Sequence, residues 1–372
     1  MARPRTNGAT RTAKREASSV QRGPDGATLL RMYEAMLLTR LIDERGIKLQ
    51  RQGRIRFFVP CMGQEAAQVA YAMALQDDDW IYPSYRDTGT ILARGVPLTE
   101  YLAQLWGNGL DLSKGRQMPN HFAFADRRLV SISSPIGTQI SQAVGTAMAM
   151  KRKGAKTVCA VSFGDGATSS NDFHAGMNFA GVYQAPCLFV CQNNHWAISL
   201  PVSEQTAQSD LASKADAYGF EGVKVDGNDA AAVYQATLAA AHRAREGGGP
   251  TLLEMVTYRI GAHSSSDDAT KYRDAEEVED WKSKDPIPRL CAVLEERGAW
   301  DAKRDAALRE RLTKAVADAV DAVEKAPQIG VASMFDDVYG RVPPFLEEQR
   351  ESLLDEVKER GGIGTGHGEF PL

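Results

Sequence analysis

TVCAVSFGDG, residues 157–166, is a run of mainly apolar residues that stops at Gly164-Asp165-Gly166. CLFVCQNN, residues 187–194, has the same form and stops at a pair of asparagines. Short apolar runs that end at turn-forming residues are typical of buried strands. Each run therefore predicts a strand with polar residues at its carboxyl end.

The segment between these two strands predicts one helix, near residues 172–181. A strand, a helix and a second strand joined in this way form a parallel, right-handed unit, so both carboxyl ends lie at one edge of the sheet. Apolar runs and helical patterns continue to alternate downstream, with strands at 223–227 and 251–259 and helices near 211–218 and 229–245. The fold class is therefore α/β, with a parallel sheet flanked by helices.

Helical periodicity also marks both ends of the chain. Upstream it predicts helices over 28–52, 64–75 and 98–105, and a strand that starts at WIY, residues 80–82. Downstream of Asp274 the pattern changes to charged helices, over 276–284 and 303–325. We therefore expect a helical C-terminal extension of the sheet domain.

Asp165 and Asn194 follow two neighbouring strands, so we expect them to face each other across a small space. A carboxylate and an amide oxygen suit Mg²⁺, and a phosphate completes the coordination that this ion rarely obtains from protein alone. The segment ATSSND after Gly166 opens a helix whose free N–H groups favour the same anion. Taken singly, the glycine and asparagine pairs are also common in ordinary turns.

The 372 residues carry a net charge of -4, which gives no reason to expect nucleic acid as a partner. No apolar run reaches the roughly 20 residues of a membrane span. Five cysteines form no CxxC pair, and this odd number favours a reducing compartment and buried thiols.

The first 27 residues are rich in Arg, Ala, Ser and Thr, and this composition predicts a disordered tail. The same composition also fits a mitochondrial transit peptide. We expect a cytoplasmic protein of bacterial type, with the mitochondrial matrix as the alternative.

Longer stretches resemble a known family, the alpha subunit of the decarboxylating component of 2-oxo acid dehydrogenase complexes. The resemblance covers nearly the whole chain after residue 28 and is carried by GDGATSSNDFHAGMNFAG, QNNHWAIS, SKGRQMP, SSPIGTQISQAVG, VDGND and YRIGAHSSSDDATKYR. Within that family, SKGRQMP, SSPIGTQ and HAGMNFA look most like branched-chain (2-oxoisovalerate) dehydrogenase. Pyruvate and acetoin dehydrogenase are the alternatives.

The resemblance implies thiamine diphosphate with Mg²⁺ as cofactors, bound in the thiamine-diphosphate-binding fold. Mg²⁺ would be held by Asp165, the side chain of Asn194 and the carbonyl of Trp196, where the family usually has Tyr. The cofactor would be contacted by Tyr85, Arg86, Ser134, Ile136, Gly164, Asp165, Gly166, Ala167, Asn194, Trp196 and His263. A potassium loop would consist of Ser133, Pro135, Thr138 and Gln139, although a helix N-terminus capped by Thr138 is an alternative or additional role.

His263 and Ser264 are the catalytic residues that the resemblance implies, in the polar loop IGAHSSSDD. His263 would contact the phosphate and the reacting centre and assist acyl transfer to a lipoyl group, and Ser264 would orient it. His121 matches a position near the site. Gln192 stands where branched-chain members carry a phosphate-binding Arg, so that contact is lost here. Added phosphate on the serines of this loop would repel the cofactor.

The family's beta subunit supplies the glutamate that activates the cofactor ring, so we expect an α₂β₂ heterotetramer that is inactive as the alpha subunit alone. The other expected partners are a 2-oxo acid and the lipoyl-bearing acyltransferase core. In this scheme residues 28–330 form the cofactor-binding domain, and residues 331–372 form a tail that packs on the partner subunit. A regulatory subunit that kept the fold without catalysis is the alternative of a different class.

Overall fold

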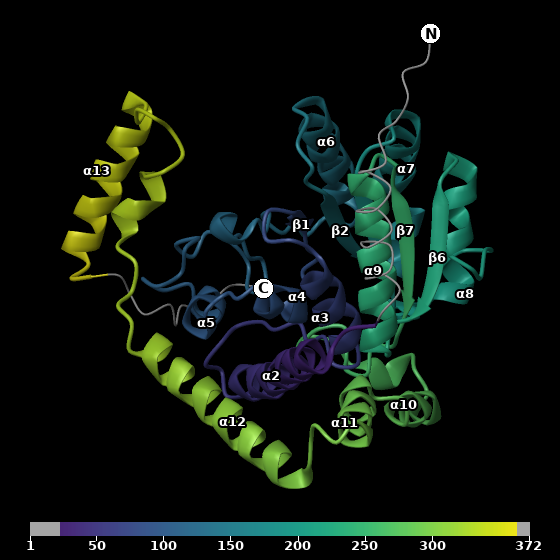
Figure 1. Ribbon diagram of the computed structural model, residues 1–372. Coiled ribbons are helices and arrows are strands. Elements are labelled where there is room, and N and C mark those ends of the chain that lie inside the picture. The colour runs from purple at the N-terminus through teal and green to yellow at the C-terminus, as the bar shows by residue number, and fades with distance from the viewer. Residues whose placement is uncertain (1–22, 363–372) are drawn as a thin grey trace.

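A parallel sheet of five strands lies at the centre of the computed structural model, which describes residues 23–362 (Figure 1). Its order is β1-β2-β3-β7-β6. The strands are β1 (Trp80–Tyr82), β2 (Cys159–Gly164), β3 (Cys187–Asn193), β6 (Glu221–Asp226) and β7 (Thr251–Val256). The predicted α/β class is confirmed.

The two faces of the sheet are apolar because side chains alternate along each strand. On β3, Cys187, Phe189 and Cys191 join the core on one face, while Leu188 and Val190 join the core on the other. Both faces therefore need helices to cover them, as expected for a parallel sheet.

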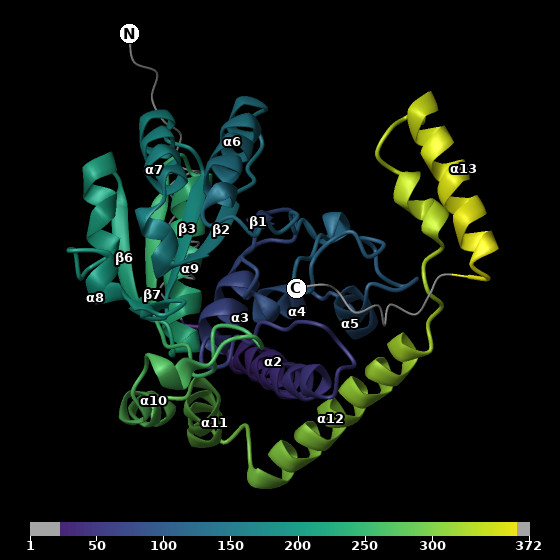
Figure 2. The same cartoon turned by 180° about the vertical axis from the view of Figure 1, so that it is seen from behind.

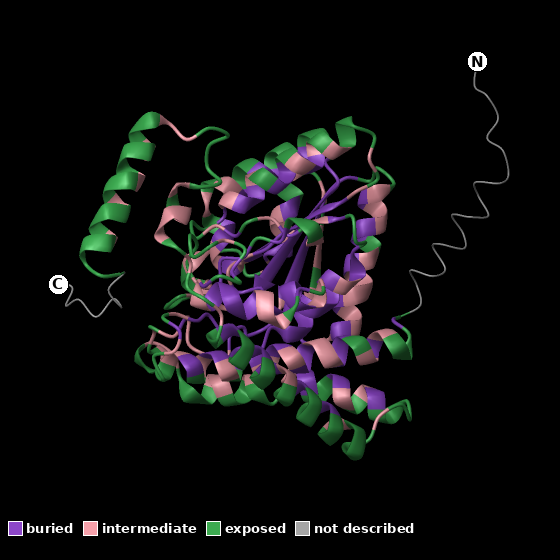
Figure 3. Cartoon of the chain, turned by 90° about the vertical axis from the view of Figure 1, so that its left-hand side faces the viewer, coloured by how far each residue is buried: buried purple, intermediate pink, exposed green. Residues whose placement is uncertain are grey.

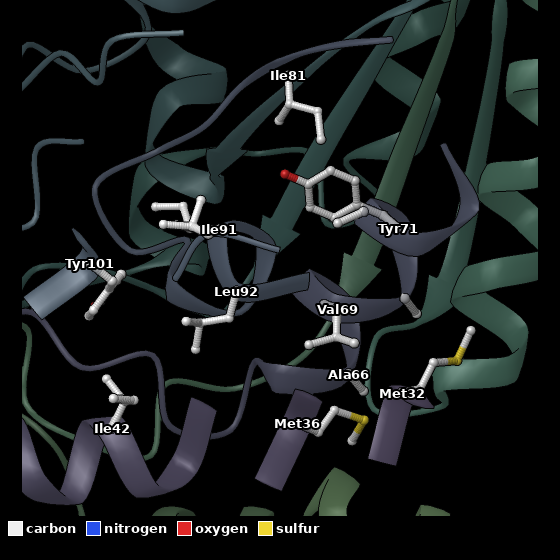
Figure 4. Close-up of a cluster of buried hydrophobic side chains, with 14 of the residues drawn as sticks. Met32, Met36, Ile42, Ala66, Val69, Tyr71, Ile81, Ile91, Leu92 and Tyr101 are labelled. Atoms are coloured by element: carbon white, nitrogen blue, oxygen red, sulfur yellow. The ribbon is translucent and has the colours of Figure 1, made fainter. Parts of the chain in front are cut away.

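Helices cover the two faces as separate layers, which Figures 1 and 2 show from opposite sides. α6 (Thr138–Arg152) and α7 (Asn171–Tyr183) pack together on the face of Phe163 and Phe189. On the other face α3 (Glu65–Ala74) packs on α9 (Ala230–Arg245), and α2 (Gly26–Arg51) lies beneath them. Side chains from α2, α3, α4, α5 and β1 meet in this lower core (Figure 4).

The remaining elements are short or lie towards the C-terminus. They are α4 (Thr88–Ala93), α5 (Leu98–Trp106), η1 (Ala125–Arg127), η2 (Asp165–Ser169), β4 (Trp196–Ala197), β5 (Leu200–Pro201), α8 (Val202–Gln205), η3 (Ala212–Tyr218), η4 (Ala269–Lys271), α10 (Ala275–Lys282), α11 (Pro286–Glu296), α12 (Ala302–Glu324), η5 (Val331–Phe335) and α13 (Pro344–Glu359). α12 packs along α2 and α5, whereas α13 stands apart from the body and is largely exposed (Figures 1 and 3).

The first described helix begins close to the domain boundary that the sequence predicts at residue 27. α2 already begins at Gly26, because the Asp25 side chain accepts a hydrogen bond from the Thr28 N–H at 2.7 Å and caps the helix. The remainder of the predicted disordered tail, residues 1–22, lies outside the described residues.

Other differences concern the type, the bounds or the number of the predicted helices and strands. The segment predicted as a helix over 211–218 is a 3-10 helix, and β7 ends at Val256 rather than at residue 259. Helices α4, α8 and α11 are not among the predicted elements. α6 begins at the alternative helix N-terminus near Thr138, and α13 lies within the predicted tail. Thr138 does not cap α6: it is the first helical residue, and Gly137 occupies the cap position without a side-chain bond.

Within residues 23–362, no helix combines the length and the apolar character that crossing a membrane requires.

Two helical glycines allow the packing of α7 to be tested. A Cβ at Gly181 would lie 2.2 Å from the carbonyl oxygen of Tyr218, whereas a Cβ at Gly145 on α6 would meet nothing within 4 Å. Gly181→Ala should lower the free energy of unfolding by about 1–3 kcal/mol, because backbone has to move. Gly145→Ala should raise it by about 0.5–1 kcal/mol through helix propensity. Denaturant unfolding of both variants measures this, and equal effects would contradict the close contact.

Candidate functional site

A cavity of about 630 Å³ lies at the carboxyl edge of β2 and β3. This is the edge at which parallel α/β proteins bind ligands. Most of the predicted site residues line it: Tyr85, Arg86, Ser133, Ser134, Pro135, Ile136, Gln139, Gly164, Asp165, Gly166, Ala167, Asn194, Trp196 and His263, together with His121 and Gln192. Thr138 and Ser264 are not among the lining residues.

Asp165 and Asn194 face each other as the sequence predicts. The Asn194 N–H donates to Asp165 Oδ1 at 3.3 Å. The second oxygen of Asp165, Oδ2, is buried and has no hydrogen-bond partner within the described residues. Burial raises the pKa of Asp165 to about 6, against the lowering effect of two backbone N–H groups and of Arg259 and Arg86. A buried carboxylate oxygen without a partner is the kind of atom that a cation would satisfy.

Gln64 holds the side chain of Asn194. Its Oε1 accepts a hydrogen bond from the Asn194 amide at 3.1 Å, while Asn194 Oδ1 accepts from the Trp196 N–H at 3.2 Å. The amide oxygen of Asn194 is thereby kept on the side of the following loop. Sequence reasoning missed Gln64, because it lies in an irregular segment before α3 that carries no motif.

Arg259 is a second residue that sequence reasoning missed. Its guanidinium is buried and donates to the carbonyl of Trp196 at 3.3 Å and to that of Ile198 at 2.6 Å. Burial, followed by the charge of Arg86, lowers its pKa to about 10. The signal that could have found it is an Arg at the end of the apolar run TLLEMVTYR.

Arg86 joins the cavity to the His263 loop. It donates to the Pro60 carbonyl at 2.5 Å, to the His263 carbonyl at 2.8 Å and to His263 Nδ1 at 3.0 Å. Because a guanidinium only donates, His263 Nδ1 must accept, and the neutral ring carries its proton on Nε2. Burial, followed by the charges of Arg86 and Arg259, lowers the pKa of His263 to about 3.

Ser264 does not orient His263 by a hydrogen bond to its ring. The hydroxyl of Ser264 accepts from the Ser266 N–H at 3.3 Å, and Asp267 accepts from the His263 N–H at 2.7 Å. The ring of His263 is held by Arg86 and lies edge-on to Tyr85, with 6.0 Å between the ring centroids.

The SSPIGTQ segment also lines the cavity and contacts His121, on which the Tyr85 ring stacks. His121 Nδ1 lies 3.1 Å from the Pro119 carbonyl, which only accepts, so His121 Nε2 accepts from Ser134 Oγ at 2.5 Å. The hydroxyl of Thr138 lies 2.9 Å from Ser133 Oγ and 3.2 Å from the Pro135 carbonyl. Gln139 donates to the Ser162 carbonyl, and its own amide oxygen is buried without a partner in the described part of the chain.

Gln192 lines the cavity, and three buried groups fix its side chain. Its amide nitrogen donates to Asp87 and to Ser162 Oγ, and its oxygen accepts from Gln68.

Position 166, next to Asp165, has no room for a side chain. A Cβ at Gly166 would lie 2.9 Å from Cβ of Ala197.

The electrostatics of the cavity favour an anion. Arg86 and Arg259 are both buried, and neither forms an ion pair with a carboxylate among residues 23–362. A buried charge that is solvated only by neutral groups attracts a negative ligand. In the same range, no three His, Cys, Asp or Glu side chains gather as a metal site, so a cation at Asp165 would need oxygens from amide, backbone and ligand.

Four cysteines are buried thiols and Cys291 is half-buried, which corrects the expectation of full burial for it.

The chain belongs to the dehydrogenase E1 component family, whose model matches residues 33–332. Among its relatives is the mitochondrial 2-oxoisovalerate dehydrogenase subunit alpha 1 of Arabidopsis thaliana, 44% identical over 333 residues, which cover 89% of this chain and 70% of the relative. The 3-methyl-2-oxobutanoate dehydrogenase subunit alpha of Mycobacterium tuberculosis is 43% identical, covering 89% and 88%. The mitochondrial 2-oxoisovalerate dehydrogenase subunit alpha of Homo sapiens is 42% identical, covering 90% and 75%. The resemblance read from the motifs is confirmed.

Replacing Arg86 tests the electrostatic description of His263. Arg86→Gln removes one positive neighbour but not the burial, so the pKa of His263 should rise from about 3 and stay below 6.5. The folded protein disfavours the charged His263 ring. The contribution of His263 to the stability of the folded protein is therefore complete above pH 6.5 and declines as the pH falls toward 3. NMR titration of isotope-labelled histidine measures the shift. Arg94→Gln, which removes a guanidinium bonded to the Gln76 carbonyl, is the control; an unchanged His263 in Arg86→Gln would refute the coupling.

Proposed function

We propose that this chain is the alpha subunit of a branched-chain 2-oxo acid dehydrogenase, which decarboxylates a 2-oxo acid oxidatively and acylates a lipoyl group. One observation carries the proposal: Asp165, which contacts Asn194 through Oδ1 and whose buried Oδ2 has no partner within residues 23–362, lies in a cavity with two buried guanidiniums. Its support is the family membership and the names of the relatives.

The family implies thiamine diphosphate, and the cavity has features that fit it. When bound, thiamine diphosphate supplies the carbon nucleophile and the electron sink for loss of CO₂. Mg²⁺ would be held by Asp165, Asn194 Oδ1 and the carbonyl of Trp196, which has a lone pair beyond the one that Arg259 uses. The diphosphate would complete the coordination.

The remaining predicted residues divide between the two ends of the cofactor. Arg86, with its fork of donors, and Tyr85 would contact the diphosphate, as would the backbone of Gly164, Gly166 and Ala167. Ser134 and Ile136 would hold the ring. The lost contact at Gln192 is consistent with its amide being used within the protein.

His263 would act through its Nε2–H. With Nδ1 occupied by Arg86, this N–H is the donor that remains for an oxygen of the phosphate or of the reacting group. A diphosphate close by would raise the pKa of the ring, because a negative neighbour favours the charged form. Ser264 would support the loop through Ser266 rather than the ring itself.

A potassium ion would fit the loop of Ser133, Pro135, Thr138 and Gln139. Two oxygens, Ser133 Oγ and the Pro135 carbonyl, already lie within hydrogen-bonding distance of Thr138 Oγ1, and the Gln139 amide oxygen lacks a partner among residues 23–362. Both observations favour a cation with neutral oxygen ligands.

The second chain of the enzyme would be the beta subunit, in an α₂β₂ assembly that works with a lipoyl-bearing acyltransferase core. Residues 28–330 would form the cofactor-binding domain, and the tail from residue 331 would pack on the partner. The exposed Met334, Tyr339 and Phe345 of the tail support this role. The compartment stays a prediction from residues 1–22, which lie outside the described residues.

Substrate turnover separates the branched-chain function from pyruvate or acetoin dehydrogenase. The chain co-expressed with its beta subunit should turn over 3-methyl-2-oxobutanoate at least about tenfold better than pyruvate, because each additional buried methyl group contributes about 1 kcal/mol or more. The alpha subunit by itself should be inactive. Reduction of a lipoyl acceptor with a panel of 2-oxo acids measures this; a preference for pyruvate would reverse the assignment.

Calorimetric titration with thiamine diphosphate and Mg²⁺ separates a catalytic subunit from a regulatory one. Asp165→Asn keeps the size of the side chain but not its charge, so binding should be lost. The wild-type affinity should fall about tenfold per pH unit below pH 6, where a proton competes with the metal. Asp172→Asn, which lies in the same sequence stretch but outside the cavity lining, is the control. No binding by the wild-type assembly would refute the enzyme reading.

A further inference from the structure

The irregular segment Phe57–Gly63, here called the 57–63 loop, forms one wall of the cavity. Phe57 and Val59 line the cavity, and the carbonyl of Pro60 accepts the hydrogen bond from Arg86 at 2.5 Å. The position of this loop therefore sets the position of Arg86 and of the His263 ring that Arg86 holds.

Side chains from other elements hold the loop through its backbone N–H groups. Asn120 accepts from Val59 at 3.0 Å, Asp43 Oδ2 accepts from Cys61 at 2.6 Å, and Glu65 Oε2 accepts from Gly63 at 2.9 Å. Asp43 comes from α2, and Glu65 is the first residue of α3. Two carboxyl groups from two helices thus hold the same loop.

Within residues 23–362, only one of these two carboxyl groups is paired with a cation. Glu65 pairs with Arg40 at 2.5 Å, and Arg40 also pairs with Asp285 at 2.8 Å. Asp43 is fully buried, forms no ion pair in the described part of the chain, and its Oδ1 has no hydrogen-bond partner there. A buried carboxylate without a cation of its own is strongly disfavoured relative to the neutral acid.

We propose that Asp43 is a positioning residue for this site, which in its neutral form fastens the 57–63 loop and, through Pro60 and Arg86, the catalytic wall of the cavity. The proton lies on Oδ1, because Oδ2 accepts from the Cys61 N–H. This inference rests on the proposed function only for its catalytic readout.

The charges around Asp43 agree with this protonation state. Burial, followed by the negative charge of Glu65, raises the pKa of Asp43 to about 8, against the lowering effect of the Cys61 N–H and of Arg40. The other titratable groups beside it are Cys61 and Tyr101, and burial raises the pKa of both. Ionisation of Asp43 at alkaline pH would therefore put a second negative charge beside Glu65 and loosen the loop.

The effect on stability has a definite sign. The pKa of Asp43 is raised from 3.8 to about 8, so the folded protein disfavours the ionised form. The contribution of Asp43 to stability therefore falls as pH rises from about 4 to about 8. Asp43→Asn retains an oxygen acceptor for Cys61 and should remove this dependence.

The test compares three variants with the wild-type chain, each co-expressed with the beta subunit. Asp43→Asn should keep neutral-pH activity within about twofold and lose the alkaline decline near pH 8. Asp43→Leu leaves the Cys61 N–H unpaired and should weaken binding of thiamine diphosphate with Mg²⁺ about tenfold. Asp79→Asn is the matched control: Asp79 is equally buried but is paired with Arg245 at 2.7 Å, so its replacement should lower the melting temperature without changing the pH profile.

Two readouts do not depend on turnover. At neutral pH the infrared spectrum of the wild type should contain a protonated-carboxyl band that is absent from Asp43→Asn, and the melting temperature of Asp43→Asn should vary less with pH. These measurements decide the proposal even if Asp43→Leu fails to fold. They also decide it if the wild-type assembly shows no turnover, because that result would count against the proposed function alone. An infrared band and alkaline decline that persist in Asp43→Asn would overturn the role of Asp43.

Discussion

The parallel pairing of β2 with β3 is the constraint on which the site depends. Their register sets Gly164 opposite Gln192, so the two chains leave the sheet side by side. Asp165 and Asn194 are then close enough for a direct hydrogen bond, although a whole helix separates them in sequence. The cavity exists because the apolar strands stop at this edge and the polar loops diverge above it.

Around that edge the protein concentrates positive charge without neutralising it. Arg86 and Arg259 donate to neutral groups, namely carbonyl oxygens, the His263 ring and the Tyr272 hydroxyl, which accept their hydrogen bonds but leave their charge uncompensated. Burial, followed by this charge, keeps His263 neutral, and burial keeps part of the Asp165 population protonated near pH 6. All four groups therefore respond to the arrival of an anion and a cation, which links ligand binding to the protonation of the site.

The support beneath the cavity is made of buried polar groups that no motif records. Gln64 orients Asn194, Gln192 is held by Gln68 and Asp87, and Asp43 holds the 57–63 loop. Such residues are hard to recognise in sequence, since a buried Gln or Asp looks like a surface residue until its partners are known. Their hydrogen-bond partners come from distant parts of the chain. The partner of Gln64 is Asn194, and the partner of Asp43 is Cys61.

The sequence by itself determined the α/β class, the strands that end at Asp165 and Asn194, and the family, because local periodicity and short motifs carry that information. It also placed Tyr85, Arg86, Ser134 and His263 at one site, through motif matches rather than through spacing. Only the tertiary structure decided that Arg86 rather than Ser264 holds the His263 ring, and that Thr138 begins a helix without capping it. These outcomes depend on hydrogen-bond directions and on burial among distant segments, which are properties of the packed chain and not of any window of sequence.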